Sequence, residues 1–158
     1  MNIAANPVIE ADQTVYLKDY QKPSYLVESI HLDIQVYDDH TIVDSTLVMK
    51  RQAAGELVLL GRDLELQYIQ MNGQLLNAGQ YQLDSEQFVI TDAPDQVIVQ
   101  TKVMIHPESN TQLEGLYKAG DLFVTQNEPE GFRKITFYPD RPDVLAEFTT
   151  RVEADKKY

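Results

Sequence analysis

Cysteine is absent from this 158-residue chain, and basic residues are scarce. Without cysteine there is no disulfide framework, no thiolate nucleophile and no cysteine-ligated zinc. Only 13 lysines and arginines stand against 25 aspartates and glutamates, which leaves a formal charge of −12. This balance argues against a nucleic-acid partner and against docking on an anionic membrane, because both need clustered basic side chains.

Long hydrophobic runs are missing as well. The apolar stretches are only a few residues long, far short of the ~20 residues that span a bilayer. The opening sequence, MNIAANPVIEADQ, has no cationic start followed by an apolar run, so it does not have the pattern of a signal peptide. Because 43% of the residues are hydrophobic, the chain is too apolar for intrinsic disorder. We expect one acidic, cytoplasmic, globular domain.

We expect residues 1–24 to form an irregular lead-in, because the prolines of Asn6-Pro7 and Lys22-Pro23 interrupt regular secondary structure. From Tyr25 onward the pattern becomes that of strands. Apolar and polar residues alternate from Ile30 to Tyr37 and again over Thr41–Arg51, and a polar turn between the two runs predicts a hairpin.

Further strand and turn signals follow along the chain. Asn72-Gly73 is its strongest hairpin-turn signal, because both residue types tolerate positive φ angles. Gln96–His106 alternates cleanly, and Leu122–Gln126 is a shorter candidate strand. Near the end we expect a helical turn at Asp143–Ala146 and a strand from Glu147 to Ala154. The spacing predicts an all-β fold over residues 25–158, an antiparallel sandwich or curved sheet with little helix.

Few residues offer chemistry. His31, His40 and His106 have no second histidine at metal-ligand spacing, and no HExxH, GxSxG or phosphate-binding glycine loop occurs. Glu128 and Glu130 flank Pro129 in a loop just after a predicted strand. Two such glutamates are ordinarily solvated surface charges, and their spacing does not imply the carboxylate separation of a glycosidase.

The segment from Asn110 to Asp155 closely resembles the first domain of bacterial aminopeptidase N, in the family of zinc-dependent gluzincin aminopeptidases. The family pattern runs in order through an EGLY phrase, a strand ending in TQ-x-E, an EGFR-type turn, a YxDRPDVLA-x-FT stretch and a strand reaching ADK. Its elements stand here at Glu114–Tyr117, Thr125–Glu128, Glu130–Arg133, Tyr138–Thr149 and Ala154–Lys156. A looser likeness extends over residues 15–158.

The resemblance implies a saddle-like, β-rich N-terminal domain that packs against a thermolysin-like catalytic domain of the same parent chain. Residues 25–158 would be this domain, truncated before the catalytic domain with its GAMEN and HExxH motifs. The parent would use one Zn²⁺ to remove N-terminal residues from peptides. The fragment would hold no catalytic residue and no metal ligand, and alone it would be inactive.

In the family, the glutamate of TQ-x-E binds the substrate's free α-amino group, and the glutamine two residues earlier lines the same site. The resemblance maps these substrate-binding roles onto Glu128 and Gln126. The chemistry is reasonable, because at pH 7 carboxyl groups are ordinarily ionised and α-amino groups are mostly protonated. Glu130 and Asp140 are assigned to turns, and the partner of Arg133 is left open.

Two other functions compete with this interpretation. One is a non-catalytic β-sandwich interaction module that binds protein or carbohydrate through an edge or loop, for which the nine tyrosines offer aromatic contacts. The other is an independent hydrolase that uses loop carboxylates. GAMEN and HExxH motifs in the sequence after Tyr158 would favour the aminopeptidase over both.

Overall fold

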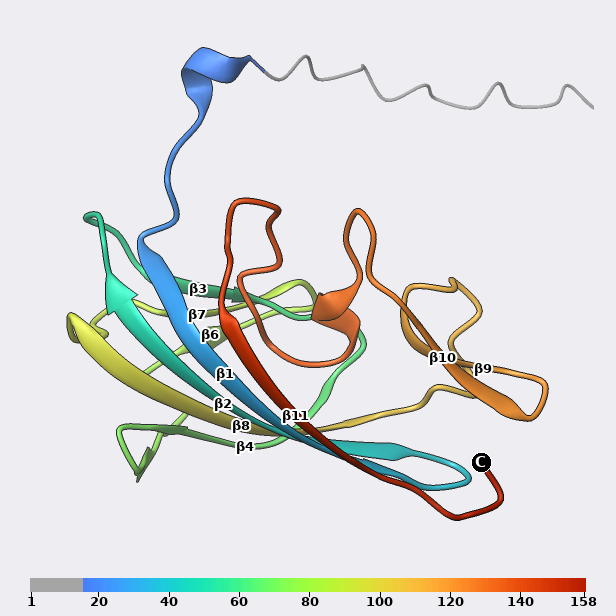
Figure 1. Ribbon diagram of the computed structural model, residues 1–158. Coiled ribbons are helices and arrows are strands. Elements are labelled where there is room, and N and C mark those ends of the chain that lie inside the picture. The colour runs from blue at the N-terminus through green and yellow to red at the C-terminus, as the bar shows by residue number, and fades with distance from the viewer. Residues whose placement is uncertain (1–15) are drawn as a thin grey trace, which may run out of the picture.

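The computed structural model describes residues 16–158, which are almost entirely β (Figure 1). Two 3-10 helices, η1 (Leu17–Asp19) and η2 (Phe132–Lys134), are the helical elements of this part. The expected irregular lead-in lies partly outside the described residues, and between Tyr16 and Ser24 the chain contains η1 and otherwise irregular backbone. No helix within residues 16–158 is long and apolar enough to cross a membrane.

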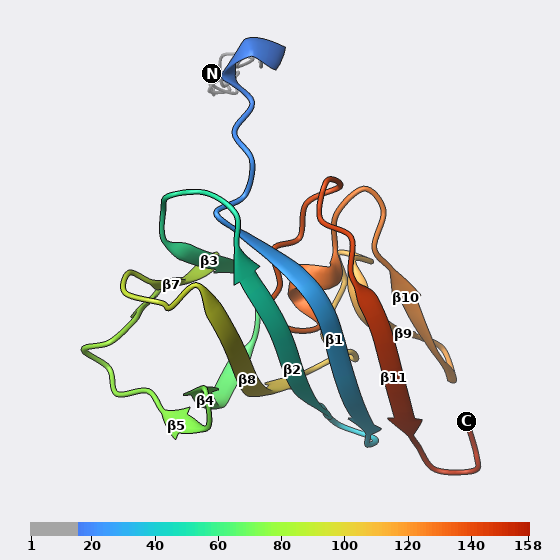
Figure 2. The ribbon, with the colours of Figure 1, turned by 60° about the vertical axis from the view of Figure 1, so that its left-hand side comes forward.

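The largest sheet has six strands in the order β11-β1-β2-β8-β4-β5 and is strongly twisted (Figures 1 and 2). Its strands are β1 (Tyr25–Val36), β2 (Thr41–Arg51), β4 (Glu65–Met71), β5 (Gln74–Leu75), β8 (Gln96–Ile105) and β11 (Glu147–Glu153). Neighbours are antiparallel, as predicted, except that β11 runs parallel to β1. The all-β prediction with little helix is confirmed.

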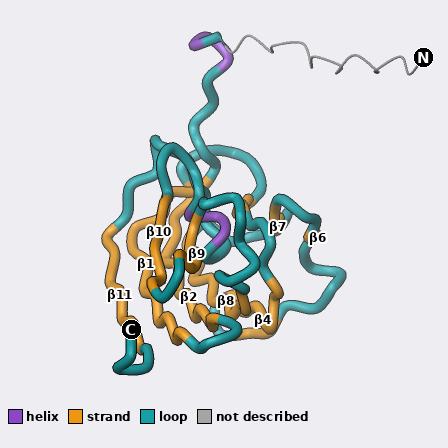
Figure 3. Tube along the Cα trace, turned by 90° about the vertical axis from the view of Figure 1, so that its right-hand side faces the viewer, coloured by secondary structure: helices purple, strands orange, loops and turns teal. Residues whose placement is uncertain are grey.

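Two smaller sheets complete the fold. The strands β3 (Leu57–Leu60), β7 (Gln87–Ile90) and β6 (Gln82–Leu83) form a second layer in the order β3-β7-β6. A separate hairpin joins β9 (Gly115–Ala119) to β10 (Leu122–Gln126). Figure 3 shows η2 close to this hairpin, at the side of the molecule where the chain passes from β10 toward β11.

The hydrophobic core lies between the six-stranded sheet and the β3-β7-β6 layer. Along β2, buried and partly buried positions alternate from Thr41 to Met49, because successive side chains point to opposite faces of the sheet. The inward face of the large sheet, with Leu47 and Val99 fully buried, meets Leu59 and Phe88 from the second layer. One continuous core therefore holds the two layers together.

The segment after η2 belongs to this core and fixes η2 in place. Phe137 is 2% exposed, and its ring centroid lies 5.8 Å from that of Phe88. A Cβ at Gly61 would lie 2.4 Å from the Phe137 ring, so only glycine allows this approach. Leu60 and Tyr138 exchange two backbone hydrogen bonds of 2.8 and 3.0 Å. The segment is thus attached to β3 by packing and by hydrogen bonds.

Candidate functional site

Gln126 and Glu128 lie at the exit of the β9–β10 hairpin. Gln126 is the last residue of β10 and is paired with Gly115 at the start of β9. Its side-chain amide Nε2 donates a hydrogen bond of 3.1 Å to the backbone oxygen of Glu128. The structure therefore brings the two expected substrate-binding residues together in one loop, and their roles remain predictions.

The Glu128 side chain is exposed, and within residues 16–158 no hydrogen bond or ion pair engages its carboxylate. Glu130, two residues later, pairs with the guanidinium of Arg133 at 2.9 Å. The two glutamates that look alike in the sequence thus differ in structure. Glu130 holds a local contact, whereas the Glu128 carboxylate is available to a partner.

Two glycines allow the loop to return against the hairpin. Gly131 has a φ of +154°, and a Cβ there would lie 2.6 Å from the backbone oxygen of Gln126. Gly115 has a φ of +71°, and its Cβ would lie 2.8 Å from Cβ of Lys134 and 3.0 Å from the Gly131 oxygen. Backbone approaches of this kind exclude a side chain, so glycine is required at both positions.

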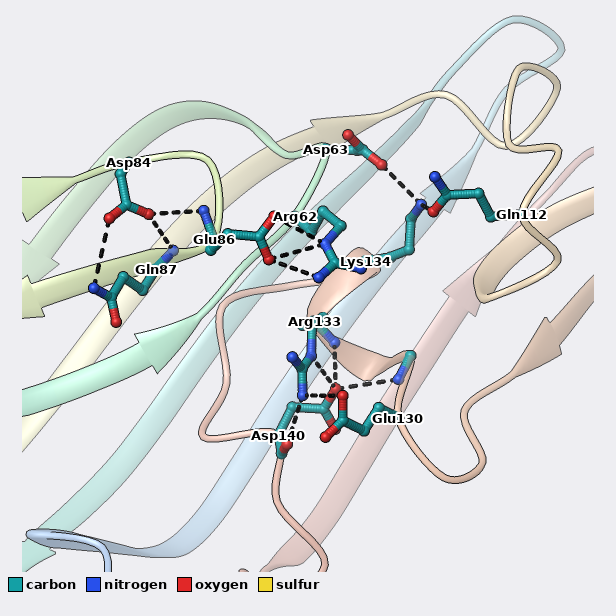
Figure 4. A network of polar contacts seen from close by, with 11 residues as sticks. Arg62, Asp63, Asp84, Glu86, Gln87, Gln112, Glu130, Arg133, Lys134 and Asp140 are labelled. Carbon is teal, nitrogen blue, oxygen red and sulfur yellow. Dashed lines mark hydrogen bonds and ion pairs between the residues drawn. The ribbon is translucent and has the colours of Figure 1, made fainter. Parts of the chain in front are cut away.

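Asp140 is the central acceptor beneath this loop (Figure 4). Its Oδ2 atom accepts hydrogen bonds from the Gly131 N–H at 3.1 Å, from the Arg133 N–H at 3.2 Å and from Arg133 Nε at 3.0 Å. The Arg133 guanidinium also donates to the backbone oxygen of Asp140 at 3.0 Å. Arg133, whose partner the sequence could not identify, therefore pairs with two carboxylates, those of Asp140 and Glu130.

Lys134 leaves η2 in a different direction from Arg133 (Figure 4). Its side chain is buried, and its ammonium group donates to Gln112 Oε1 at 2.6 Å and pairs with Asp63 at 2.7 Å. The three residues line a cleft of about 610 Å³ that does not include Glu128. Sequence reasoning missed this contact, because a lysine beside an arginine in a polar segment gives no sign of burial.

Aromatic rings lie on another side of η2. Phe132 packs edge-on against Tyr138 and Phe148, with centroid distances of 5.0 and 5.7 Å. Burial raises the pKa of Tyr138 to about 12, and its hydroxyl has no hydrogen-bond partner within the described residues. A phenol in this setting stays protonated at neutral pH and contributes apolar contacts.

His31 lies on β1, whereas His40 and His106 lie next to the paired residues Thr41 of β2 and Ile105 of β8. His40 stacks on Tyr37, while His106 contacts the Asp39 backbone oxygen at 3.2 Å and the Glu65 carboxylate at 3.0 Å. These two acceptors raise the pKa of His106 above its ordinary value. Within residues 16–158 no three His, Cys, Asp or Glu side chains gather as metal ligands.

The matching family model is that of an M1 peptidase domain, and the similar curated proteins are aminopeptidases. The model of the Peptidase M1 N-terminal domain matches residues 19–158. The chain is 41% identical to aminopeptidase N of Caulobacter vibrioides over 151 residues, which are 94% of this chain and 18% of that protein. It is 39% identical to aminopeptidase N of Escherichia coli over 146 residues, with coverages of 91% and 17%.

Solved structures show the same fold. Aminopeptidase A of Legionella pneumophila, in complex with aspartic acid, superposes with a TM-score of 0.82 at 28% identity, covering 89% of this chain and 17% of that one. An M1 zinc metallopeptidase of Deinococcus radiodurans gives 0.69 at 21% identity, covering 83% and 32%, and shows the fold alone. The chain thus spans less than a fifth of the curated relatives it matches.

Proposed function

This chain belongs to the Peptidase M1 N-terminal domain family, and from that premise we propose that it is the N-terminal β domain of a zinc aminopeptidase. In this proposal residues 1–24 are a lead-in and residues 25–158 form the domain. The parent enzyme removes N-terminal residues from peptides, and this domain packs against its catalytic domain. The curated relatives named aminopeptidase N support this assignment.

The proposed contribution of the domain is an anchor for the substrate's free α-amino group. The observation that carries it is the exposed Glu128 carboxylate, which has no partner within residues 16–158 and stands on a loop joined to the hairpin. A charge-assisted hydrogen bond to an ammonium group contributes about 1.5–3 kcal/mol. Gln126, at the base of the loop, lines the same site. Such an anchor selects chain ends, because it sets the distance from the amine to the scissile bond.

The residues described here do not suit the zinc ion of the parent enzyme, because no three potential ligands gather among them. In the proposal the metal ligands therefore come from the catalytic domain. The role of this domain is confined to binding and orienting the peptide's N-terminus.

The test is a matched pair of variants in the full-length enzyme. Glu128→Gln keeps the side chain's shape and removes its charge, so kcat/KM should fall roughly ten- to hundredfold while zinc content and thermal stability are preserved. Both KM and kcat should change, because the tethered amine also positions the scissile bond. Glu130→Gln removes the charge of a solvent-exposed glutamate, and Arg133 keeps its buried partner Asp140, so this variant should have little effect. Equal and small effects at both positions would refute the anchor.

A further inference from the structure

An amine anchor is effective only if its carboxylate is held in place. Binding constellations have to be kept within about 0.5 Å of their productive geometry, and this is achieved by residues whose own positions are locked by packing and hydrogen bonds. The Glu128 side chain has no such contact of its own within the described residues. The loop that carries it must therefore be fixed at its ends.

The first end of the loop is fixed by strand pairing. Gln126 is paired in register with Gly115, and its side-chain amide donates to the Glu128 backbone oxygen at 3.1 Å. These contacts come from a two-stranded hairpin outside the two core layers. They define where the loop begins and leave its far end to other residues.

The far end is fixed by a single buried carboxylate. Asp140 is 9% exposed, and its Oδ2 atom receives the Gly131 N–H together with two donors of Arg133. Asp140 follows the segment that is bridged to β3 by the Leu60–Tyr138 hydrogen bonds. It therefore connects the core of the domain to the residue that closes the loop.

We infer that Asp140 is a positioning residue of the amine anchor: it holds Gly131 and η2 so that Glu128 is presented in a fixed place. This inference rests on the proposed role of Glu128. Arg133 takes part by bringing two donors, its backbone N–H and its Nε, to the same oxygen. Without the Asp140 carboxylate, the buried Gly131 N–H and the Arg133 guanidinium lose their shared hydrogen-bond acceptor, Oδ2.

The chain offers a matched control in the same DRPD stretch. Asp143 also carries a carboxylate paired with an arginine, because it receives Arg141 Nε at 2.9 Å. It accepts a further hydrogen bond from the Tyr20 hydroxyl at 2.8 Å. Neither of these partners belongs to the Glu128 loop. Loss of Asp143 therefore removes a similar ion pair without releasing the anchor.

The experiment compares Asp140→Ala, Asp143→Ala, Glu128→Gln and the Asp140→Ala/Glu128→Gln double variant in the full-length enzyme. The readout is the ratio of affinities, as competitive inhibitors, for L-leucine and for 4-methylpentanoate, which lacks only the amino group. Asp140→Ala should lower this ratio by about tenfold or more, because a displaced Glu128 carboxylate loses the charge-assisted hydrogen bond to the amine, which favours binding by about ten- to hundredfold. The double variant should be no worse than Glu128→Gln, and Asp143→Ala should equal the wild type.

Asp140→Asn keeps a side-chain oxygen for the Gly131 N–H and should recover part of the ratio. It also provides the readout if the alanine variant does not fold. An unchanged ratio in both Asp140 variants, or losses that multiply in the double variant, would overturn the positioning role while leaving the anchor intact. A Glu128→Gln enzyme with the wild-type ratio would instead refute the anchor itself, and this inference with it.

Discussion

Alanine at Gly131 should disorganise the Glu128 loop, whereas alanine at Gly73 should be tolerated. Both glycines have positive φ angles, +154° and +78°, so alanine is strained at either position. Their surroundings differ. A Cβ at Gly131 would lie 2.6 Å from the Gln126 oxygen and 3.0 Å from Asn127 Cα, whereas a Cβ at Gly73 meets none of the described atoms within 4 Å.

The magnitudes follow from these surroundings. Gly73→Ala should lower the free energy of unfolding by about 1–2 kcal/mol, the cost of the left-handed conformation alone. Gly131→Ala carries backbone strain of about 1–3 kcal/mol and crowding against backbone atoms of about 1–3 kcal/mol. The expected loss at Gly131 is therefore about 2–6 kcal/mol. It falls on the residue that joins the loop to Asp140.

Urea denaturation of the two variants measures the difference in stability. Inhibition of the proposed full-length aminopeptidase by L-leucine measures the difference in amine binding. We expect Gly131→Ala to be the less stable variant and to lose amine affinity, and Gly73→Ala to bind as the wild type does. Equal stability losses at the two positions would show that the loop accommodates the extra methyl group. Wild-type amine affinity in Gly131→Ala would show that the loop's geometry does not matter for binding.

Two further predictions concern the fold. Phe137→Ala removes a side chain that is 2% exposed and packed on Phe88, so denaturation should show a loss of about 3–5 kcal/mol; a loss typical of a surface site would contradict its place in the core. The folded state raises the pKa of His106 above its ordinary value of 6.5. The protonated imidazole therefore stabilises the fold fully at pH values below 6.5, and this stabilisation is lost as the pH rises through the raised pKa. Thermal melts should therefore show wild-type stability falling relative to His106→Gln as the pH rises above 6.5, and parallel pH profiles would refute this.

Strands with one buried face could be predicted from the sequence. The run Thr41–Arg51 is β2 with the predicted bounds, and the predicted strand Gln96–His106 is β8 one residue shorter. Both alternate because one face of the large sheet meets the core and the other faces solvent. The Asn72-Gly73 turn is confirmed as well, with φ angles of +51° and +78° between β4 and β5.

Local pattern failed where tertiary contacts decide the conformation. The helical turn predicted for Asp143–Ala146 is wrong. The Val144 N–H instead donates to the Arg141 oxygen, and the chain then runs without regular structure to β11. Val144 is buried while Leu145 is 85% exposed, so the two do not form one helical stripe. The parallel pairing of β11 with β1 is likewise set by the path of the chain, which alternation within β11 does not encode.

In the candidate site, too, the sequence predicted some features, and others depend on tertiary contacts. Gln126 and Glu128 could be singled out by their motif, and the structure places them in one loop. The sequence could not choose the partner of Arg133, because that depends on the turn that brings Asp140 back beneath Gly131. Asp140 accepts hydrogen bonds from Arg133 and Gly131, seven and nine residues earlier in an irregular segment. Contacts at such separations do not follow the periodicity of a helix or a strand, so the sequence pattern does not predict them.

The pairing of β1 with β11 has a consequence for synthesis on the ribosome. The first strand of the domain, Tyr25–Val36, finds β2 almost at once, but the strand that covers its other edge is Glu147–Glu153. At about 5–20 residues per second, roughly 5–20 seconds separate the emergence of β2 from that of β11. Throughout this interval one edge of β1 presents unpaired N–H and C=O groups, and such an edge is a template for foreign strands. The nascent chain therefore passes through a period in which a chaperone or a neighbouring nascent chain can occupy the position of β11.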